Sequence, residues 1–428
     1  MSETSHEYAT EPVPEHRTVP WLRVGVISAM VAFSLPTFVT GIEVALSVDA
    51  RTAILAILAG NVLLSMIGAF TGSVGARTRL SSYMLARVAF GTRGAAAVNL
   101  AFALSLLGWF GVNIDLFSGA VMRLLSDVTD LRIAGWIVEL AAGVVMTTTT
   151  IYGFRAINVL STVLVPVLMV VTAMLVAKAF GVRPLEDTLD LADGSELTFG
   201  QAMTSVAGAV IIGAIILPDI TRFIREWRGA IYTAVLSYAL IGSIVQGAGG
   251  LAAIAFGNDD LLDVMIVVGL SWAAFAIVIA GSWVLNSLNL YSAALSVEAT
   301  LPRLESRLLI LGLGALGTLA AFLNILDNFF LNFLQYLAVV FAPVAGVIAV
   351  DYMLLRRPAY HEARERLERP FVPAALVSWG LGALVALLGS EGLITMSGIA
   401  ALDAIAAAAV TYLVVSRFGF REVAGKAG

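Results

Sequence analysis

Trp109 is the side chain best suited to holding a planar molecule. It stands in the run Gly108-Trp109-Phe110-Gly111, inside a long apolar stretch, so that small residues flank a bulky indole. A flat ring can stack on the face of an indole. The same pattern also suits a tryptophan that only packs between helices, and the sequence leaves both uses open.

A polar stripe in the apolar stretch 264–298 is the second candidate for binding. Ser282, Asn286 and Asn289 follow one another at i, i+4 and i+7, which places them on one face of a helix. Polar side chains in such a helix face the protein interior or a watered cavity rather than lipid. We expect Asn286 to contact a ligand and Asn289 to form hydrogen bonds between helices.

Asp115 is the candidate for carrying a proton. It lies deeper within its apolar stretch than most of the acidic residues, and carboxylates at such depth are often functional. At about 100° per residue, Asp115 lies about 120° around the helix from Trp109, so the two side chains should face different cavities. A buried structural partner is an equally good interpretation of Asp115.

Enzymatic chemistry is disfavoured by the residues that the chain lacks. It has no cysteine, and its three histidines, His6, His16 and His361, lie outside the apolar stretches. No Ser-His or Cys-His pair and no thiolate metal site can therefore form inside those stretches. A membrane-embedded enzyme is thus a weak alternative, and we expect no catalytic residue and no cofactor other than a coupling ion.

The composition indicates a membrane protein. Of 428 residues, 59% are hydrophobic and only 13% are charged, about half of the roughly 25% found in soluble domains. The net charge of −5 offers no basic surface for nucleic acid, so that partner is excluded. We expect a lipid bilayer and a small-molecule substrate as partners, and the oligomeric state stays open.

Apolar stretches long enough to cross the roughly 30 Å hydrocarbon layer recur along the chain. We place twelve of them, at 22–46, 52–74, 95–122, 133–153, 157–180, 199–222, 229–256, 264–298, 307–325, 328–354, 371–389 and 392–415. The sequence therefore predicts an all-α polytopic membrane protein with twelve transmembrane helices.

The distribution of basic residues predicts the orientation. Cytoplasmic loops retain an excess of Lys and Arg. With both termini in the cytoplasm, most of the 25 basic residues fall inside, and those left outside are Arg51, Arg123, Arg132, Lys178 and Arg183. We therefore expect a multi-pass protein of the cell inner (plasma) membrane with both termini cytoplasmic.

Two pairs of short runs indicate an internal repeat. Ala32-Phe33-Ser34-Leu35-Pro36 resembles Ala214-Ile215-Ile216-Leu217-Pro218, and Val165-Pro166-Val167 resembles Ala342-Pro343-Val344. The partners lie five stretches apart, so the two halves should be inverted across the membrane. Proline removes a backbone donor, and Gly208 and Gly213 loosen the sixth stretch, so we expect the first and sixth helices to be broken.

Five segments follow from this organisation. They are a cytoplasmic N-terminal arm at 1–21, a ten-helix transport core at 22–354 with repeats at about 22–180 and 199–354, a cytoplasmic loop at 355–370, two accessory helices at 371–415, and a cytoplasmic tail at 416–428. Broken helices expose free amides and carbonyls at mid-membrane, where they can bind polar groups or cations.

Short motifs spread along the chain resemble a known family. They are Gly60-Asn61, Gly75-Ala76-Arg77-Thr78, Leu85-Ala86-Arg87, Phe90-Gly91, Gly108-Trp109-Phe110-Gly111-Val112, Asp219 with Arg222-Phe223, Leu290-Tyr291-Ser292, Pro343-Val344-Ala345-Gly346-Val347-Ile348 and Asp351-Tyr352. In this order they are similar to the nucleobase cation symporters of the cytosine permease and hydantoin permease type. The resemblance implies a LeuT-type five-plus-five inverted repeat with two extra C-terminal helices. It also implies secondary transport of a nucleobase or related ring compound, commonly coupled to sodium or protons.

The resemblance assigns the substrate site residue by residue. The family's stacking tryptophan falls on Trp109, its polar pocket residue on Asn286, and the break of its first helix on the stretch from Ala29 to Phe33. This chain departs from the family at three other positions, because Leu106 replaces a glutamine, Val210 an aromatic residue and Gly281 an asparagine. The expected substrate-binding residues are Phe33, Leu106, Trp109, Val210, Gly213, Gly281 and Asn286. The replacements remove hydrogen-bond partners, so we expect either a substrate less polar than cytosine or another binding pose.

The family's sodium site is altered as well. It would join span-1 carbonyls, here those of Ala29 and Ala32, with two adjacent hydroxyls of the eighth helix, and Val284 and Leu285 stand at those two positions. A hard cation needs oxygen ligands, and Ser282 would supply one only if the alignment shifts by two or three residues. We therefore expect no metal site other than a doubtful sodium site, and the coupling ion is either sodium or a proton at Asp115.

The sequence thus predicts a secondary active permease. We expect it to import a nucleobase or related planar ring compound by alternating access, coupled to a cation. The alternative is a proton-coupled or uncoupled transporter of a non-nucleobase metabolite on the same fold.

Overall fold

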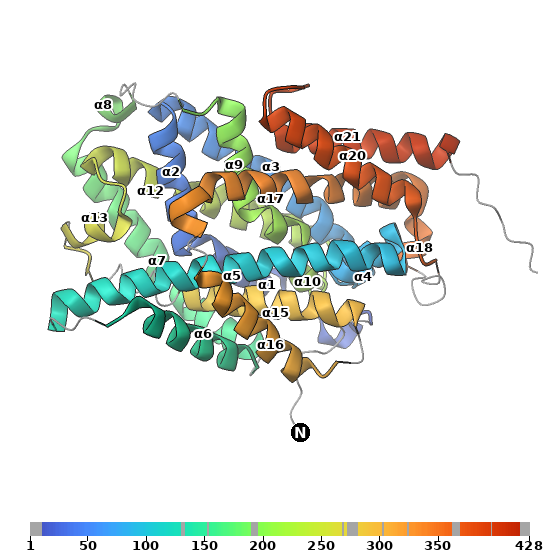
Figure 1. Ribbon diagram of the computed structural model, residues 1–428, viewed down its shortest axis with the longest axis horizontal. Coiled ribbons are helices and arrows are strands. Elements are labelled where there is room, and N and C mark those ends of the chain that lie inside the picture. The colour runs from blue at the N-terminus through green and yellow to red at the C-terminus, as the bar shows by residue number, and fades with distance from the viewer. Residues whose placement is uncertain are drawn as a thin grey trace, which may run out of the picture.

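The structure is a computed structural model of the chain. It describes residues 11–129, 133–151, 154–189, 196–267, 269–271, 281–301, 304–322, 325–361, 369–394 and 396–419. Within these residues every named element is a helix (Figure 1).

Most of the helices coincide with the expected stretches, whereas three short ones, at 82–90, 185–189 and 357–361, lie between them. The helices are α1 (Trp21–Ala32), α2 (Leu35–Ser47), α3 (Ala50–Thr78), α4 (Ser82–Phe90), α5 (Thr92–Thr129), α6 (Gly135–Ile151), α7 (Phe154–Val182), α8 (Leu185–Leu189), α9 (Phe199–Ile215), α10 (Pro218–Thr221), α11 (Arg228–Ala234), η2 (Val235–Gly242), α12 (Ser243–Phe256), α13 (Leu261–Val267), α15 (Ser282–Thr300), α16 (Ser306–Ala321), α17 (Ile325–Val350), η4 (Asp351–Leu355), α18 (Arg357–His361), α20 (Pro373–Ser390), α21 (Ala400–Val414) and η5 (Val415–Gly419).

The part of the chain that is described is therefore an all-helical membrane protein. Eight helical segments in it are long and apolar enough to cross a membrane, and α1 with α2 forms a ninth across a bend of 52°. Two shorter apolar helices, α6 and α16, match two more expected stretches. The expected stretch 264–298 includes 268 and 272–280, which lie outside the described residues. The count of twelve stays a prediction.

The break in the first span lies at Phe33 and Ser34, between α1 and α2. Pro36 has no N–H group to continue the helix, so carbonyl groups at the end of α1 lose their usual donors. The Ser34 hydroxyl replaces one of them by donating to the carbonyl of Val31 at 2.9 Å. Gly281 packs against the carbonyl of Phe33, where an added Cβ would come within 2.7 Å of that oxygen.

The interruption of the sixth stretch lies between Ile215 and Pro218. α9 is regular through Val210 and Gly213 and ends at Ile215, and α10 begins at Pro218. Proline cannot donate to the carbonyl four residues earlier, that of Ala214. The Thr71 hydroxyl of α3 donates to that carbonyl at 2.6 Å, so a neighbouring helix satisfies the freed group.

Gly208 serves close packing, and the expectation that it loosens α9 is wrong. A Cβ at Gly208 would lie 1.8 Å from the Leu334 carbonyl of α17. The two backbones are therefore in direct contact, which only glycine permits. This contact holds α17 across the middle of α9.

Long helices cross at the centre of the molecule (Figure 1). α5 runs beside α15, α16 and α6, and α3 and α17 pack on α9. α20 and α21 pair with each other at one edge, against α17. The residues between the α1–α2 break, α5, α9 and α15 therefore meet in the interior.

A buried carboxylate, Asp351, joins four segments at the end of α17. It accepts hydrogen bonds from Tyr360 of α18 at 2.7 Å and Tyr412 of α21 at 2.6 Å. It also pairs with Arg356, 2.7 Å away, whose guanidinium donates to the carbonyl of Ala89 in α4. Asp351 is thus a structural centre rather than a solvated end residue.

Asp351→Ala should lower the free energy of unfolding by about 3–5 kcal/mol, because it leaves Arg356 without its buried partner. Tyr412→Phe should cost about 1.5–3 kcal/mol, since it removes one hydrogen bond to a charged group. The measurement is the apparent melting temperature in detergent. Tyr336→Phe is the control, because Tyr336 lies on α17, which ends next to Asp351, and half of its surface is exposed. Equal melting temperatures for Asp351→Ala and the control would contradict the assignment.

Candidate functional site

A cavity lies where the α1–α2 break, α5, α9–α10 and α15 meet, and we call it the central cavity. Its volume is about 110 Å³. Its walls are mostly apolar, and Ser34, Thr37 and Thr40 of the α1–α2 region supply hydroxyl groups. Most of a small ring could be enclosed there, as is usual for small-molecule sites.

Four of the expected substrate-binding residues line the central cavity together. Leu106 and Trp109 come from one turn of α5, and Val210 and Gly213 come from one turn of α9. The i, i+3 spacing in each helix places both members of a pair on one face. The apolar Leu106 and Val210 therefore stand beside the indole.

Phe33, Gly281 and Asn286 are placed differently from the expectation, since none is among the lining residues. Phe33 is buried at the break, and Gly281 packs on its carbonyl. Asn286 is fully buried, and its amide donates to the carbonyl of Phe110 at 3.1 Å and contacts the sulfur of Met146 at 3.2 Å. In this conformation these three residues support the wall from behind.

Asn289 takes the place at the cavity that was expected for Asn286. Leu285, Leu288, Asn289 and Ser292 line the central cavity, at the i, i+3, i+4 and i+7 positions of α15. Asn289 is 8% exposed. The contact of Gly281 with the broken helix fixes the rotation of α15, and the polar stripe does not predict this contact. Ser292, one turn after Asn289, was the residue in the sequence that could have indicated which face of α15 lines the cavity.

Asp219 also borders the central cavity, which the sequence did not indicate. It is 3% exposed. Its Oδ1 accepts hydrogen bonds from the backbone N–H and the hydroxyl of Ser82, at 2.9 and 2.7 Å.

Trp109 forms part of a thin wall. Its ring meets Phe333 edge-on with centroids 5.4 Å apart, and Phe330 with centroids 6.3 Å apart. Trp109 lines the central cavity, whereas Phe330 lines a second cavity. The α1–α2 break is also part of this wall, because Ser34 lines the central cavity and Leu35 lines the second cavity.

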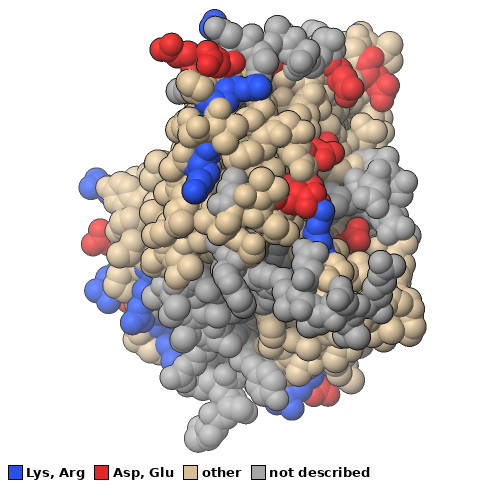
Figure 2. Space-filling view, turned by 90° about the vertical axis from the view of Figure 1, so that its left-hand side faces the viewer, with Lys and Arg blue, Asp and Glu red and all other residues tan. Residues whose placement is uncertain are grey.

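The second cavity, which we call the acidic vestibule, has a volume of about 920 Å³. Its acidic lining residues are Glu43, Asp115, Glu196, Asp259 and Asp260. Figure 2 views the molecule from the end that carries α8 and α13, and acidic side chains stand there beside a basic one near the middle of the face. Asp115 and Trp109 thus face different cavities, as their helical spacing predicts.

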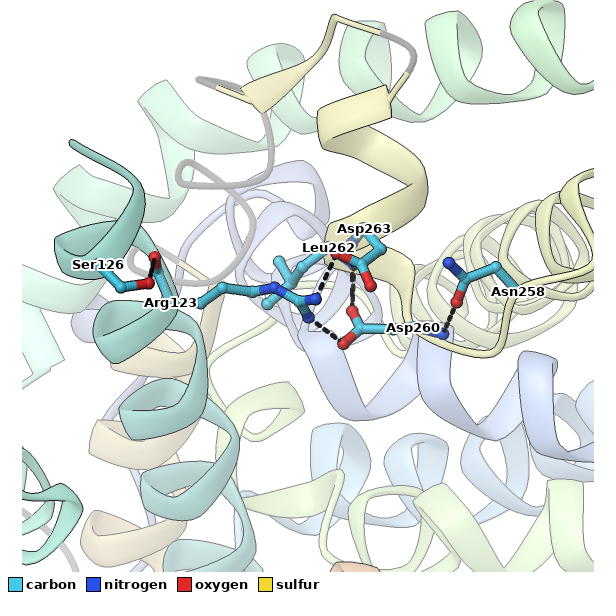
Figure 3. Close-up of polar contacts among 6 residues, drawn as sticks. All are labelled: Arg123, Ser126, Asn258, Asp260, Leu262 and Asp263. Atoms are coloured by element: carbon cyan, nitrogen blue, oxygen red, sulfur yellow. Dashed lines mark hydrogen bonds and ion pairs between the residues drawn. The ribbon is translucent and has the colours of Figure 1, made fainter. Parts of the chain in front are cut away.

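Arg123 is the cation of the acidic vestibule. From α5 it forms ion pairs with Asp260 and Asp263 at the start of α13 (Figure 3). Asp260 also accepts hydrogen bonds from the backbone N–H groups of Leu262 and Asp263. These contacts fasten the loop after α12 to the end of α5.

The expected sodium ligands lie at the break, but the helix facing it is poor in oxygen. Val284 and Leu285 are buried apolar residues at the two hydroxyl positions. Ser282 is fully buried, and its hydroxyl has no hydrogen-bond partner.

A family model described as "Permease for cytosine/purines, uracil, thiamine, allantoin" matches residues 12–414. The chain belongs to this family. It is therefore a transport protein and not an enzyme. Its multiple apolar helices and its family make this permease a multi-pass membrane protein.

Curated relatives support the assignment along most of the sequence. The cytosine permease of Escherichia coli (strain K12) is 29% identical over 412 residues, which cover 96% of this permease and 94% of the relative. The hydantoin permease of Microbacterium maritypicum is 25% identical over 385 residues, with 80% and 74% covered.

Solved structures show the same fold. Mhp1, a nucleobase-cation-symport-1 family transporter in a closed conformation with bromovinylhydantoin bound, superposes with a TM-score of 0.81 at 21% identity, covering 95% of this permease and 94% of that chain. A Na⁺-coupled sialic acid symporter superposes with a TM-score of 0.67 at 13% identity, covering 93% and 90%. Both likenesses concern the fold alone.

Trp109→Ala should weaken binding of a planar ring by more than tenfold, because it removes stacking worth about 0.5–1.5 kcal/mol together with the buried contact area of the indole. Trp109→Phe should retain part of the affinity. Binding is measured by isothermal titration calorimetry with detergent-purified protein. Trp136→Ala is the control, since Trp136 is 57% exposed. Unchanged affinity in Trp109→Ala would remove Trp109 from the site.

Proposed function

We propose that this permease is a secondary active transporter that imports a nucleobase or a related planar ring compound by alternating access. The observation that carries the proposal is the position of Trp109, whose indole lines a ring-sized cavity at the break of the first span. The permease family and the relatives named for cytosine and hydantoin support the same substrate class.

The two cavities supply the geometry for alternating access. Each would give the substrate a route to one side of the membrane, and Trp109 and Phe330 stand between them. Movement of α17, which carries Phe330 and Phe333, would open the wall toward the acidic vestibule. Because α17 touches α9 through Gly208, its rotation would also change the shape of the central cavity.

The apolar residues Leu106 and Val210 favour a ring with few polar substituents. In our proposal both contact the edge of the ring, and Gly213 leaves room for it. Phe33, Gly281 and Asn286 would shape the wall and join the site as it closes. The same apolar residues favour the second candidate function, proton-coupled or uncoupled transport of a non-nucleobase metabolite.

We also propose the complete topology that the sequence predicts. It has twelve helices, with inverted repeats at about 22–180 and 199–354, two accessory helices at 371–415, and both termini, including the arm at 1–21 and the tail at 416–428, in the cytoplasm beside the loop 355–370. The matching interruptions after Ala32 and Ile215 support the repeat. The excess of basic residues on one side supports insertion in the plasma membrane in this direction.

A thermal-shift panel tests the proposed substrate class. At least one of cytosine, uracil, hypoxanthine, thiamine, allantoin and hydantoin should raise the melting temperature of the detergent-purified protein, because a ligand that binds only the folded state stabilises it. Leucine and choline are controls without a planar ring. Stabilisation by the controls and by none of the ring compounds would reject the proposal.

For coupling we propose a proton carried by Asp115 rather than sodium. Val284 and Leu285 offer a sodium ion no oxygen, and Asp115 lies half-buried beside the other acids of the vestibule. A carboxylate there can exchange protons through the vestibule.

Uptake into proteoliposomes should stay unchanged when potassium replaces sodium at constant pH and membrane potential. Asp115→Asn should abolish accumulation driven by a pH gradient while substrate binding and exchange persist, because it resembles the permanently protonated side chain. Ser282→Ala serves as the matched variant for sodium. A sodium requirement that disappears in Ser282→Ala would assign coupling to sodium. Loss of every transport mode together with a lower melting temperature in Asp115→Asn would make Asp115 structural.

A further inference from the structure

Two polar atoms of the central cavity lack hydrogen-bond partners. Both are buried atoms of described residues that line this cavity. One is Nδ2 of Asn289, a donor, and the other is Oδ2 of Asp219, an acceptor. Neighbouring hydroxyls are satisfied within their own segments, as when Thr40 donates to the carbonyl of Pro36. Buried polar atoms without partners are uncommon in proteins, and each calls for an explanation.

One oxygen of the Asp219 carboxylate, Oδ1, accepts hydrogen bonds, and the other, Oδ2, has no hydrogen-bond partner. The two donors of Ser82, at the start of α4, both bind Oδ1. Arg222 is fully buried, and its Nε donates to the backbone carbonyl of Asp219 at 3.1 Å, so a positive charge lies near the carboxylate. The backbone N–H of Ser82 would therefore fix the orientation in which Oδ2 is presented.

Asn289 and Asp219 belong to neighbouring parts of the cavity wall. Tyr83, which follows Ser82, donates to the carbonyl of Ser292 at 2.7 Å. Ser292 lies one turn after Asn289 on α15 and lines the same cavity. A short path of contacts, from Asp219 through Ser82 and Tyr83 to Ser292, therefore joins Asp219 to the segment of α15 that carries Asn289.

We propose that Asn289 and Asp219 determine specificity by binding opposite polar groups of one ring. Nδ2 of Asn289 donates to a carbonyl oxygen or an unprotonated ring nitrogen, and Oδ2 of Asp219 accepts from a ring N–H. The inference rests on the proposed function, and it adds that the substrate must offer both groups at its edge. A ring methylated at the relevant nitrogen leaves Oδ2 buried and unpaired, so it is rejected.

The test compares cytosine, uracil and hydantoin with their mono-N-methyl derivatives, each titrated calorimetrically against the detergent-purified protein. The wild-type protein should bind one N–H form at least about tenfold more tightly than its N-methyl derivative. Asp219→Asn should reduce this preference to less than about threefold, because the amide that replaces Oδ2 is a donor. Asn289→Leu should weaken binding of both forms and leave their ratio unchanged.

Ser82→Ala is the matched control for structure. It removes the hydroxyl donor to Oδ1, so it should lower the melting temperature while the N–H to N-methyl preference persists. An Asp219→Asn protein that keeps the wild-type preference overturns the inference, even if its melting temperature falls. Failure of the proposed function gives a different result, in which the wild-type protein binds none of these rings.

Discussion

Every backbone polar group inside the hydrocarbon layer needs a partner, and this constraint decides where the permease can be irregular. At the break of the first span, Ser34 donates to the carbonyl of Val31. Before Pro218, Thr71 donates to the carbonyl of Ala214. These hydroxyls make two interruptions tolerable on either side of the central cavity, and the remaining helices pack around them.

The sequence predicted the helices and the first break well because the responsible signals are local. Apolar length predicts a span, and Pro36 predicts an interruption within a few residues. The separation of Asp115 from Trp109 followed from helical geometry alone. Trp109, Leu106, Val210 and Gly213 could be grouped because family motifs supply contacts that a single sequence does not contain.

The errors concern contacts between segments far apart in the chain. In the sequence, Gly208 indicates a weak point in a helix. In the structure, a glycine is needed there because the backbone of Leu334, more than a hundred residues away, approaches closely. The roles of Asn286 and Asn289 depend on a rotation of α15 that Gly281 and Phe33 fix together. The hydrogen bonds from Ser82 to Asp219 were missed because Ser82 belongs to another helix, α4.

The wall between the two cavities has an electrical consequence. At the point where Trp109 of the central cavity meets Phe330 of the acidic vestibule, it consists of these two side chains. With water in both cavities, most of the membrane potential falls across this layer rather than across the whole protein. A unit charge crossing it exchanges about 2.3 kcal/mol with each 100 mV of potential, whereas a neutral ring exchanges nothing. The voltage dependence of transport should therefore arise at this wall, from the charges that cross it with the substrate.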